Sequence, residues 1–311
     1  MILSQELKES TRNNSERLSP SSWNEASRVV RGFTTEPAFI EALGSEGVSP
    51  TDSTTVEYAN ALSAYAESYY SVYGQDESTD PNQSTQIRLL ASAPRLIHSQ
   101  KEINFYQSEG KKRNLTTEEK TYCNSFKPYL VWYNQLLSDY DFANPTGKMS
   151  EMSKALTEQS LLSFPYDSPL VESSIRKRMR GARTEAVSQQ LLSRTSLDYS
   201  PGTANDDLQG GDVIVIHKGL RIKVDLKSSL DPIATIRGGY DKIFKDRICY
   251  AISKKASNHG NKENYVIVLF PGFTDSDLGD SLGLHLPEKD MQSRAENIER
   301  QIRLAFRELR L

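Results

Sequence analysis

Residues 209–227, QGGDVIVIHKGLRIKVDLK, constrain the fold of this chain more than any other stretch. Two runs of aliphatic residues flank a Lys-Gly pair, a combination typical of a β-hairpin with a tight turn. Alternate residues of a strand share one face, so Asp225 and Lys227 point away from the core that the neighbouring valine and leucine enter. The turn then brings Asp212 beside Asp225. The sequence therefore predicts two carboxylates and one ammonium at one edge of a sheet.

Two carboxylates held this close repel each other unless a cation or a proton shares the site. Oxygen ligands of this kind suit Mg²⁺, which takes one or two carboxylates together with waters and a substrate phosphate. Beside them, the Lys227 ammonium would orient or deprotonate an attacking water, or balance charge developing on the phosphate. This set of groups indicates phosphodiester hydrolysis. Taken singly, Asp212 would be a turn acid and Lys227 a surface residue at the end of a strand.

A basic helix, SSIRKRMRGARTEAVSQQLL at residues 173–192, precedes the hairpin. Its cations recur at helical spacing and would clamp a phosphate backbone, although such a stripe is also typical of a solvated helix face. Glu185 lies a turn past Arg178 and Ala182, where it would complete the carboxylate set or pair with the arginines. The candidate nucleic-acid contacts are Arg176, Lys177, Arg178, Arg180 and Arg183, with Ser228 after the hairpin.

The order of these motifs resembles the PD-(D/E)XK nuclease superfamily. A glutamate on a helix comes first, QGGD then opens a strand, and VDLK closes the next strand. The resemblance spans roughly residues 170–275. It implies a restriction-endonuclease-like αβββαβ domain with a mixed central sheet. Gly211 stands where the family name has proline, a position that varies within the superfamily.

The resemblance also implies roles for the site residues. Mg²⁺ would be held by Asp212, Asp225 and the main-chain carbonyl of Leu226. Lys227 would act on the nucleophilic water, and Glu185 would assist the metal or the water. Enzymes of this superfamily usually act on double-stranded DNA as homodimers, so that two sites cut both strands.

The rest of the chain divides by its pattern into three parts. Residues 1–20 are polar and are expected to form a mobile tail. Residues 21–165 are expected to form a helical domain and residues 166–311 the nuclease domain, which together predict an α+β or α/β fold. In the first domain, helices are expected at Ser53–Tyr70, capped by Asp52 or Ser53, and at Gln86–Gln100 and Thr117–Ser138. In the second, helices are expected at 170–194, 240–255 and 290–309, and strands in a short apolar stretch before the hairpin and at 212–217, 220–227 and 265–270.

Composition narrows the class of protein. A net charge of −3 gives no global attraction to nucleic acid or membranes, so a polyanion site must come from a local cluster. Two cysteines and four scattered histidines give no zinc or disulfide pattern, and no apolar run is long enough to span a membrane. The sequence has no GxxxxGK[ST] stretch, so no nucleotide cofactor is expected. These features predict a cytoplasmic protein.

The sequence therefore favours a Mg²⁺-dependent endodeoxyribonuclease of the type II restriction kind. Two alternatives stay open: a structure-specific nuclease of a phage or mobile element that cuts junctions or ends, and an inactive nuclease fold that only binds DNA. The DNA sequence recognised depends on loop geometry that the residues do not reveal. Two further residues are expected to be structural: Asp206 as a turn former, and His217 on the face opposite to Asp212.

Overall fold

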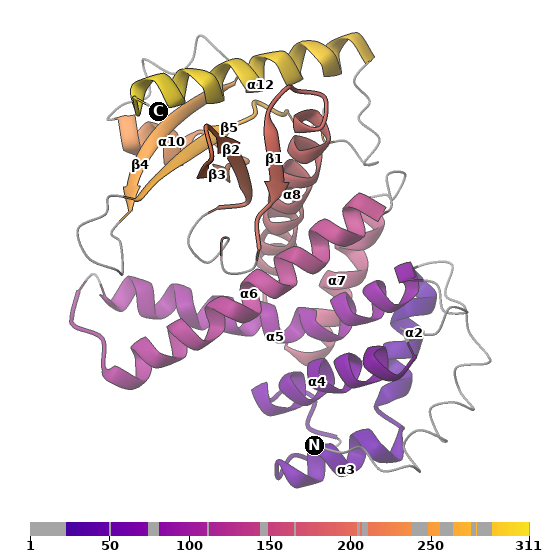
Figure 1. The fold of residues 1–311 in the computed structure, drawn as a ribbon. Helices are drawn as coiled ribbons and strands as arrows, with labels where there is room; N and C mark the ends of the chain where they lie inside the picture. Colours follow the sequence, from indigo (N-terminus) through magenta and orange to yellow (C-terminus); the bar gives the residue numbers. More distant parts are fainter. Residues whose placement is uncertain are drawn as a thin grey trace. The chain divides into compact units, whose positions relative to one another are not determined.

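The computed structural model consists of helices followed by a sheet with flanking helices (Figure 1). The described residues are 23–49, 51–73, 81–110, 112–143, 149–164, 166–203, 206, 211–237, 248–255, 264–274, 278 and 288–310. The predicted tail, residues 1–20, lies outside them. The architecture is mixed α+β and mostly helical, with a five-stranded open sheet that contains both parallel and antiparallel pairs.

The chain divides into two compact units inside one continuous helix. Its described residues form a first unit up to Lys177 and a second unit from Arg178 onward. The division falls within helix α8, Ser168–Leu192. The composition change around residues 165–169 predicts an earlier boundary. Pro169, however, lies in the first turn of α8, where proline is well tolerated, so it begins the helix.

The first unit contains only helices among its described residues. Its elements are α2 (Trp23–Phe33), α3 (Pro37–Ser45), α4 (Val56–Tyr73), α5 (Pro81–Gly110), α6 (Thr117–Ala143) and α7 (Met149–Ser163). The three helices predicted from the sequence in this part of the chain are confirmed as α4, α5 and α6. Helices α5 and α6 are longer than expected and continue through Pro94 and Pro128.

The N-terminal cap of α4 lies two or three residues later than expected. The Thr55 hydroxyl accepts a hydrogen bond from the Tyr58 amide at 3.1 Å, which makes Thr55 the cap. The prediction of Asp52 or Ser53 is therefore wrong. Asp52 accepts instead from the Thr54 hydroxyl at 3.0 Å, within the turn that precedes the helix.

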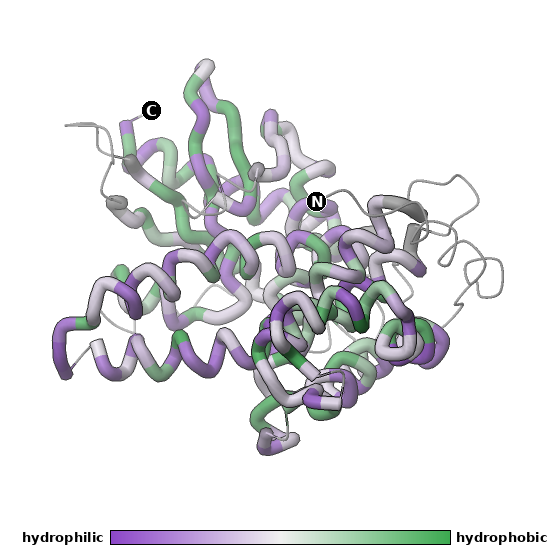
Figure 2. Tube along the Cα trace, turned by 90° about the horizontal axis from the view of Figure 1, so that it is seen from below, coloured by the Kyte–Doolittle hydropathy of each residue, from purple (hydrophilic) through white to green (hydrophobic). Residues whose placement is uncertain are grey.

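Helix α5 is central to the first unit, since it packs against α2, α4, α6 and α7. Its side chains Leu89, Leu90 and Leu96 are buried. Hydrophobic and hydrophilic positions are interleaved along these helices (Figure 2). The aromatic stripe of α6 contributes Phe126 and Tyr133 to the buried core, as its helical spacing predicts.

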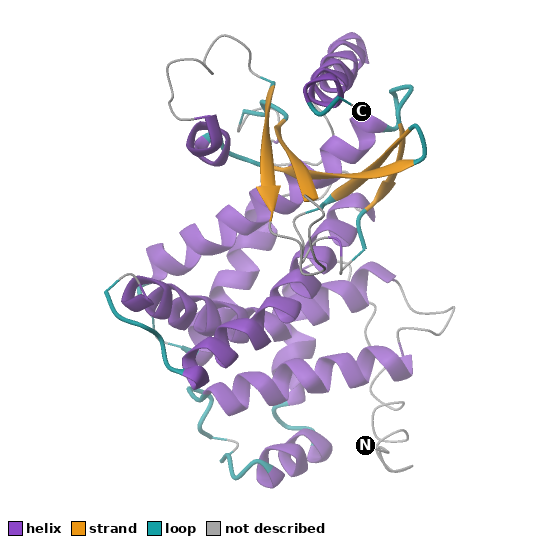
Figure 3. Ribbon diagram, turned by 60° about the vertical axis from the view of Figure 1, so that its left-hand side comes forward, coloured by secondary structure: helices purple, strands orange, loops and turns teal. Residues whose placement is uncertain are grey.

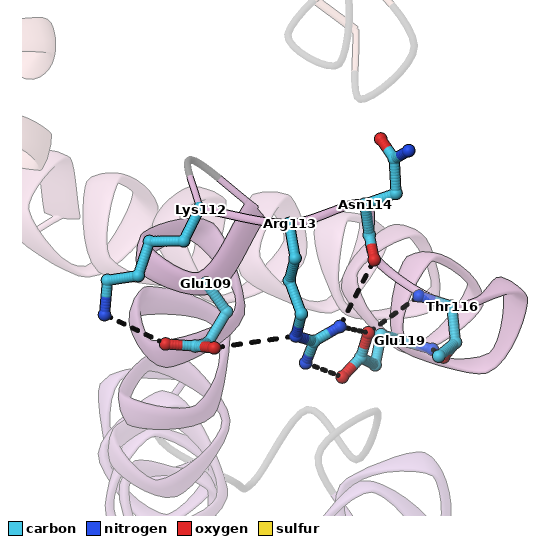
Figure 4. A network of polar contacts seen from close by, with 6 residues as sticks. All are labelled: Glu109, Lys112, Arg113, Asn114, Thr116 and Glu119. Atoms are coloured by element: carbon cyan, nitrogen blue, oxygen red, sulfur yellow. Dashed lines mark hydrogen bonds and ion pairs between the residues drawn. The ribbon is translucent and has the colours of Figure 1, made fainter.

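The turn between α5 and α6 is held by a surface network of charges (Figure 4). Arg113 donates to both carboxylate oxygens of Glu119, at 2.6 and 2.8 Å, and lies 3.5 Å from Glu109. The Thr116 amide donates to Glu119 at 2.7 Å, and the Glu119 amide donates to the Thr116 hydroxyl at 3.2 Å. This reciprocal pair is a capping box at the start of α6. The hydrogen bonds from Arg113 and then Thr116 lower the pKa of Glu119 to about 2.

The second unit contains the sheet, drawn in orange in Figure 3. Its strand order is β1-β2-β3-β5-β4. Strands β3 and β5 are parallel, and the other neighbouring pairs are antiparallel. The elements after α8 are β1 (Asp198–Pro201), β2 (Val213–His217), β3 (Leu220–Leu226), α10 (Asp231–Arg237), β4 (Cys249–Lys255), β5 (Asn264–Phe270) and α12 (Glu288–Glu308). The predicted hairpin is confirmed as β2 and β3. Lys218 and Gly219 join them with φ angles of 49° and 78°, as a tight hairpin turn requires.

Strand β4 replaces part of an expected helix. The pattern over residues 240–255 predicts a helix, but residues 249–255 form β4, which pairs antiparallel with β5. Residues 240–247 lie outside the described part of the chain. Burial alternates along β4: Cys249 and Ala251 enter one apolar cluster, and Tyr250 enters the other. Pairing with β5 overrides the local helical pattern and adds a strand to the expected αβββαβ order.

The sheet has two apolar faces. Helices α8 and α12 contribute to the cluster on one face, called the α12 face, and α10 packs on the other, called the α10 face, beside β4 and β5. Along β3, Val224 and Leu226 enter the cluster of the α12 face. By strand alternation Asp225 and Lys227 belong to the α10 face. The valine and leucine thus point into a core, as the hairpin pattern predicts.

Candidate functional site

Asp212 and Asp225 occupy facing positions at the open end of the β2–β3 hairpin. The ladder ends at the pair Val213 with Val224, and Asp212 and Asp225 are the residues that follow this pair on the two chain segments. The carbonyl of Asp212 accepts a hydrogen bond from the Gly202 amide, at 2.9 Å, on the β1 side. Because the main chain of Asp212 bonds toward β1, its place opposite β3 corresponds to a non-hydrogen-bonded position of an antiparallel ladder. At such positions cross-strand side chains approach most closely. The hairpin therefore brings both acids to one face and one edge of the sheet.

The carboxylate of Asp212 is anchored by a main-chain amide. Leu226 N donates to Asp212 Oδ2 at 2.6 Å. If the ladder continued, this amide would pair with Gly211, the residue before Asp212. The side chain thus replaces the last hydrogen bond of the β2–β3 ladder. The orientation of this carboxylate consequently depends on how the chain enters β2.

Asp225 is buried, and its carboxylate forms an ion pair with the Lys227 ammonium. The Asp225 side chain is 10% exposed and that of Lys227 is 35% exposed, so the ammonium reaches solvent while the carboxylate is largely enclosed. The main chain of Lys227 is fixed by its amide, which donates to Leu269 O of β5 at 2.8 Å. Burying a carboxylate costs free energy unless a counter-charge or hydrogen bonds offset it. Lys227 supplies such a counter-charge.

The donors at this edge are of the kind that a hard divalent cation uses. Asp212 and Asp225 provide carboxylates beside the last pair of the β2–β3 ladder, and Leu226 lies between Asp225 and Lys227 in sequence. In proteins Mg²⁺ binds through one or two carboxylates and completes its shell with waters and phosphate oxygens. The residues present therefore fit a two-carboxylate Mg²⁺ site, in which the cation and Lys227 would share the negative charge of Asp225.

Glu185 does not join these residues. Within the part of the chain that the structure describes, no three acidic, histidine or cysteine side chains are placed to share a metal ion. Glu185 accepts a hydrogen bond from Gln189 Nε2 at 3.3 Å, one turn along α8. The expected role of Glu185 as a third carboxylate stays a prediction.

The arginine stripe of α8 is only partly a surface feature. Arg183 is fully buried and donates from Nη1 to Leu278 O at 2.8 Å. Arg180 donates to Phe273 O at 3.3 Å. Both side chains hold the segment that follows β5, so the assignment of Arg183 to a nucleic-acid contact does not fit its burial. Helical spacing alone does not distinguish an arginine that faces solvent from one that faces the interior.

The other candidate nucleic-acid contacts differ in exposure. Arg176 and Lys177 are exposed, and Arg176 forms an ion pair with Glu172 at 2.8 Å, one turn earlier in α8. Arg178 and Ser228 are half-buried. Arg176 and Lys177 are therefore the residues of this set that are most accessible to a ligand.

Asp206 has a larger role than the turn former expected from the sequence. It is 8% exposed and accepts hydrogen bonds from the Thr203 amide and hydroxyl, at 3.1 and 2.7 Å. Arg221 and Lys223 approach it within 3.5 and 3.6 Å. Burial raises the pKa of Asp206, but the Thr203 hydrogen bonds and the two cations outweigh it, so the pKa lies below its usual value. The sequence contained one signal for this role. Thr203 and Asp206 are three residues apart, a spacing typical of side chains that form hydrogen bonds with a nearby main-chain amide.

His217 is structural, as expected. Its ring stacks on Phe306 of α12, with ring centroids 4.5 Å apart. This contact lies at the turn end of the hairpin, whereas Asp212 lies at the open end. The structure therefore gives His217 a packing contact that accounts for its position.

Comparison of the chain with protein-family models, curated proteins and solved structures finds no match. Among the described helices, none combines the length and the apolar character needed to cross a membrane.

Proposed function

We propose that this chain is a Mg²⁺-dependent deoxyribonuclease that hydrolyses phosphodiester bonds at the open end of the β2–β3 hairpin. The observation that carries the proposal is that Asp212 and Asp225 follow the last pair of the β2–β3 ladder, where Asp212 accepts from the Leu226 amide and Lys227 is bound to Asp225. Like charges on directly opposite strand positions destabilise a sheet. A bound cation explains such a position better than packing does.

The order of the strands supports a relation to the PD-(D/E)XK nucleases. Helix α8 precedes three antiparallel strands, and after α10 the strand β5 lies parallel to β3. The proposed acids and lysine lie at the end of β2–β3, where the VDLK stretch closes β3. On this basis we propose that the second unit has a restriction-endonuclease-like fold, with β4 as an additional edge strand.

The chemistry follows from the groups at the site. Asp212, Asp225 and the carbonyl of Leu226 would hold Mg²⁺, which when bound promotes ionisation of a water and neutralises phosphate charge. Lys227 donates to the scissile phosphate and stabilises the negative charge that develops there. The water oxygen bonds to phosphorus and its proton leaves to solvent, while the bond from phosphorus to O3′ breaks and O3′ takes up a proton. The products are a 5′-phosphate and a 3′-hydroxyl.

The proposed substrate is double-stranded DNA, and the proposed assembly is a cytoplasmic homodimer with one site for each strand. Arg176 and Lys177, both exposed on α8, would contact backbone phosphates. Such contacts position a duplex without reading its sequence. Recognition of bases would then come from other parts of the chain.

Cleavage of supercoiled plasmid DNA tests this proposal. The wild-type protein should cut with Mg²⁺, and either EDTA or the Asp225→Asn substitution should stop the cutting. Asp198→Asn, the same chemical change at an exposed position of β1, is the matched control and should cut like the wild type. A fixed banding pattern would support a restriction-type enzyme, and cutting of branched DNA alone would support a structure-specific one. Cutting that survives Asp225→Asn, or folded wild-type protein that does not cut with Mg²⁺, would contradict the proposal.

A further inference from the structure

The loop from β1 to β2 is closed at both ends by main-chain hydrogen bonds. The Gly202 amide donates to Asp212 O at 2.9 Å, and the Gly211 amide donates to Asp206 O at 2.8 Å. A side chain at Gly202 would place its Cβ 2.2 Å from Gly211 O, which the main chain cannot accommodate without a shift. The two ends of the loop are thus in a contact that only glycine permits. The point at which the chain enters β2 depends on this closure.

The Asp206 side chain contacts both Thr203 and strand β3. The Thr203 amide and hydroxyl both donate to Asp206 Oδ2, and the Asp206 amide donates back to the Thr203 hydroxyl at 3.2 Å. The Lys223 ammonium lies 3.6 Å from Asp206 Oδ1. Because Asp206 is 8% exposed, water competes little with these contacts. Asp206 therefore joins the loop to strand β3.

Lys223 extends this connection to the candidate site. It precedes Asp225 by two residues in β3, so the two side chains share the α10 face. A Cβ added to Gly211 would lie 3.1 Å from the Cβ and Cγ atoms of Lys223. The stem of the lysine therefore packs directly on the residue that precedes Asp212, while its ammonium is held by Asp206.

We propose that Asp206 and Lys223 form a positioning pair that holds the carboxylate of Asp212 in the orientation in which it binds Mg²⁺. The pair acts through the loop end at Gly211 and touches neither the cation nor the DNA. This inference rests on the function proposed above and adds two residues to it. In metal sites, removal of groups that orient a ligand lowers metal affinity or activity by about 10–100-fold.

The dependence of plasmid cleavage on Mg²⁺ separates a positioning role from a general one. Asp206→Asn keeps the shape of the side chain and removes its charge. It should raise the Mg²⁺ concentration for half-maximal cleavage by about 10-fold or more, with a nearly wild-type rate at saturating Mg²⁺. Asp206→Glu should recover part of the Mg²⁺ affinity, and Asp198→Asn should behave as wild type. An equal loss of rate at every Mg²⁺ concentration would overturn the proposal.

Lys223→Met is the second variant. It keeps an unbranched stem over Gly211 and removes the ammonium, so it should shift the Mg²⁺ dependence in the same direction as Asp206→Asn. It also tests the pair if Asp206→Asn does not fold. A wild-type Mg²⁺ dependence in folded Lys223→Met protein would remove the lysine from the proposal and overturn the pair.

Amide hydrogen exchange, followed by NMR in EDTA, tests the pair without any cleavage. The Leu226 amide donates to Asp212, whereas the adjacent Lys227 amide donates to Leu269 O in β5. In Asp206→Asn and Lys223→Met, protection at Leu226 should fall about 10-fold while protection at Lys227 is kept. Asp212→Ala gives the protection of the Leu226 amide when its acceptor, the Asp212 carboxylate, is absent.

Unchanged protection at Leu226 in both variants would overturn the positioning pair. A fall at Leu226 and Lys227 together would also overturn it, because that result indicates general loosening of the sheet. Failure of the wild-type protein to cut DNA would overturn the proposed function instead, and the exchange result would still decide whether the pair orients Asp212.

Discussion

Two charged clusters in this protein differ in what they do for the fold. At the turn between α5 and α6, Glu109, Arg113 and Glu119 alternate in sign, and their contacts support a helix end. At the open end of the β2–β3 hairpin, Asp212 and Asp225 are like charges on the residues that follow the last ladder pair. The first arrangement joins opposite charges, whereas the second places two like charges near each other and depends on Lys227 and the Leu226 amide to offset them. A charged cluster indicates function most strongly when its geometry costs stability.

The two charged clusters also differ in how deeply they are buried. The network at the turn lies at the surface, where salt and water weaken ion pairs. Asp225 is 7% exposed, so its charge must be offset by groups in contact with it, as Lys227 does in the structure. The two clusters should therefore also respond differently to substitution.

The largest expected effect is on cleavage. Asp225→Asn should lower the rate of Mg²⁺-dependent plasmid cutting by at least about 10²–10³-fold, because it removes negative charge that the cation needs. Arg113→Met, which disrupts the other cluster, should retain the wild-type rate. The measurement is the initial rate of plasmid nicking. A comparable loss of rate in both variants would remove the distinction between the clusters.

The next effect is on stability. Mg²⁺ at about 100 times its Kd should add about 2.7 kcal/mol to the free energy of unfolding of the wild-type protein, since only the folded chain brings the two acids together. Arg113→Met should show the same gain, and Asp225→Asn should show almost none. Urea unfolding with Mg²⁺ and with EDTA measures both. An equal gain in Asp225→Asn would place the cation elsewhere.

A smaller effect concerns DNA affinity. Arg176→Gln combined with Lys177→Gln should lower the slope of log K against log salt concentration by about 0.9 for each phosphate that the protein no longer neutralises. Binding is measured in the Asp225→Asn background, so that no DNA is cut. Lys112→Gln combined with Lys120→Gln, at the α5–α6 turn, is the matched control. An unchanged slope in the α8 variant would show that Arg176 and Lys177 form a solvated helix face and do not contact DNA.

The smallest effect concerns pH at the turn itself. The pKa of Glu119 is lowered from its ordinary 4.5 to about 2. Since the folded value is the lower one, the contribution of this carboxylate to stability is complete well above pH 4.5 and is lost as pH falls toward 2. An NMR titration of the Glu119 carboxyl carbon should have its midpoint near 2, and Arg113→Met should move it toward 4.5. A wild-type midpoint near 4.5 would show that the network does not form in solution.

The hairpin is the part of the fold that the residues predict best, because its signals are local. Alternation along β2 and β3 and the turn at Lys218 and Gly219 depend on neighbouring residues alone. The facing positions of Asp212 and Asp225 follow from the same pattern. Strand β4 could not be predicted in this way, since it forms by pairing with β5 across an intervening segment.

The roles of individual polar residues were less predictable than the strands. The burial of Arg183 depends on the segment after β5, which packs on α8 from a distant part of the sequence. The same is true of Asp206, whose partners include Arg221 and Lys223 in β3. Helical spacing and turn composition describe a residue and its neighbours in sequence. They do not identify the elements that later cover it.

The position of a bound cation in a crystal tests the central claim most directly. Mn²⁺ accepts the oxygen ligands that suit Mg²⁺ and can be located by its anomalous scattering. The account predicts one ion at the open end of the hairpin, with an oxygen of Asp212 and an oxygen of Asp225 each about 2.0–2.5 Å away. An ion bound elsewhere, or carboxylates that remain too far apart to share one, would contradict the claim.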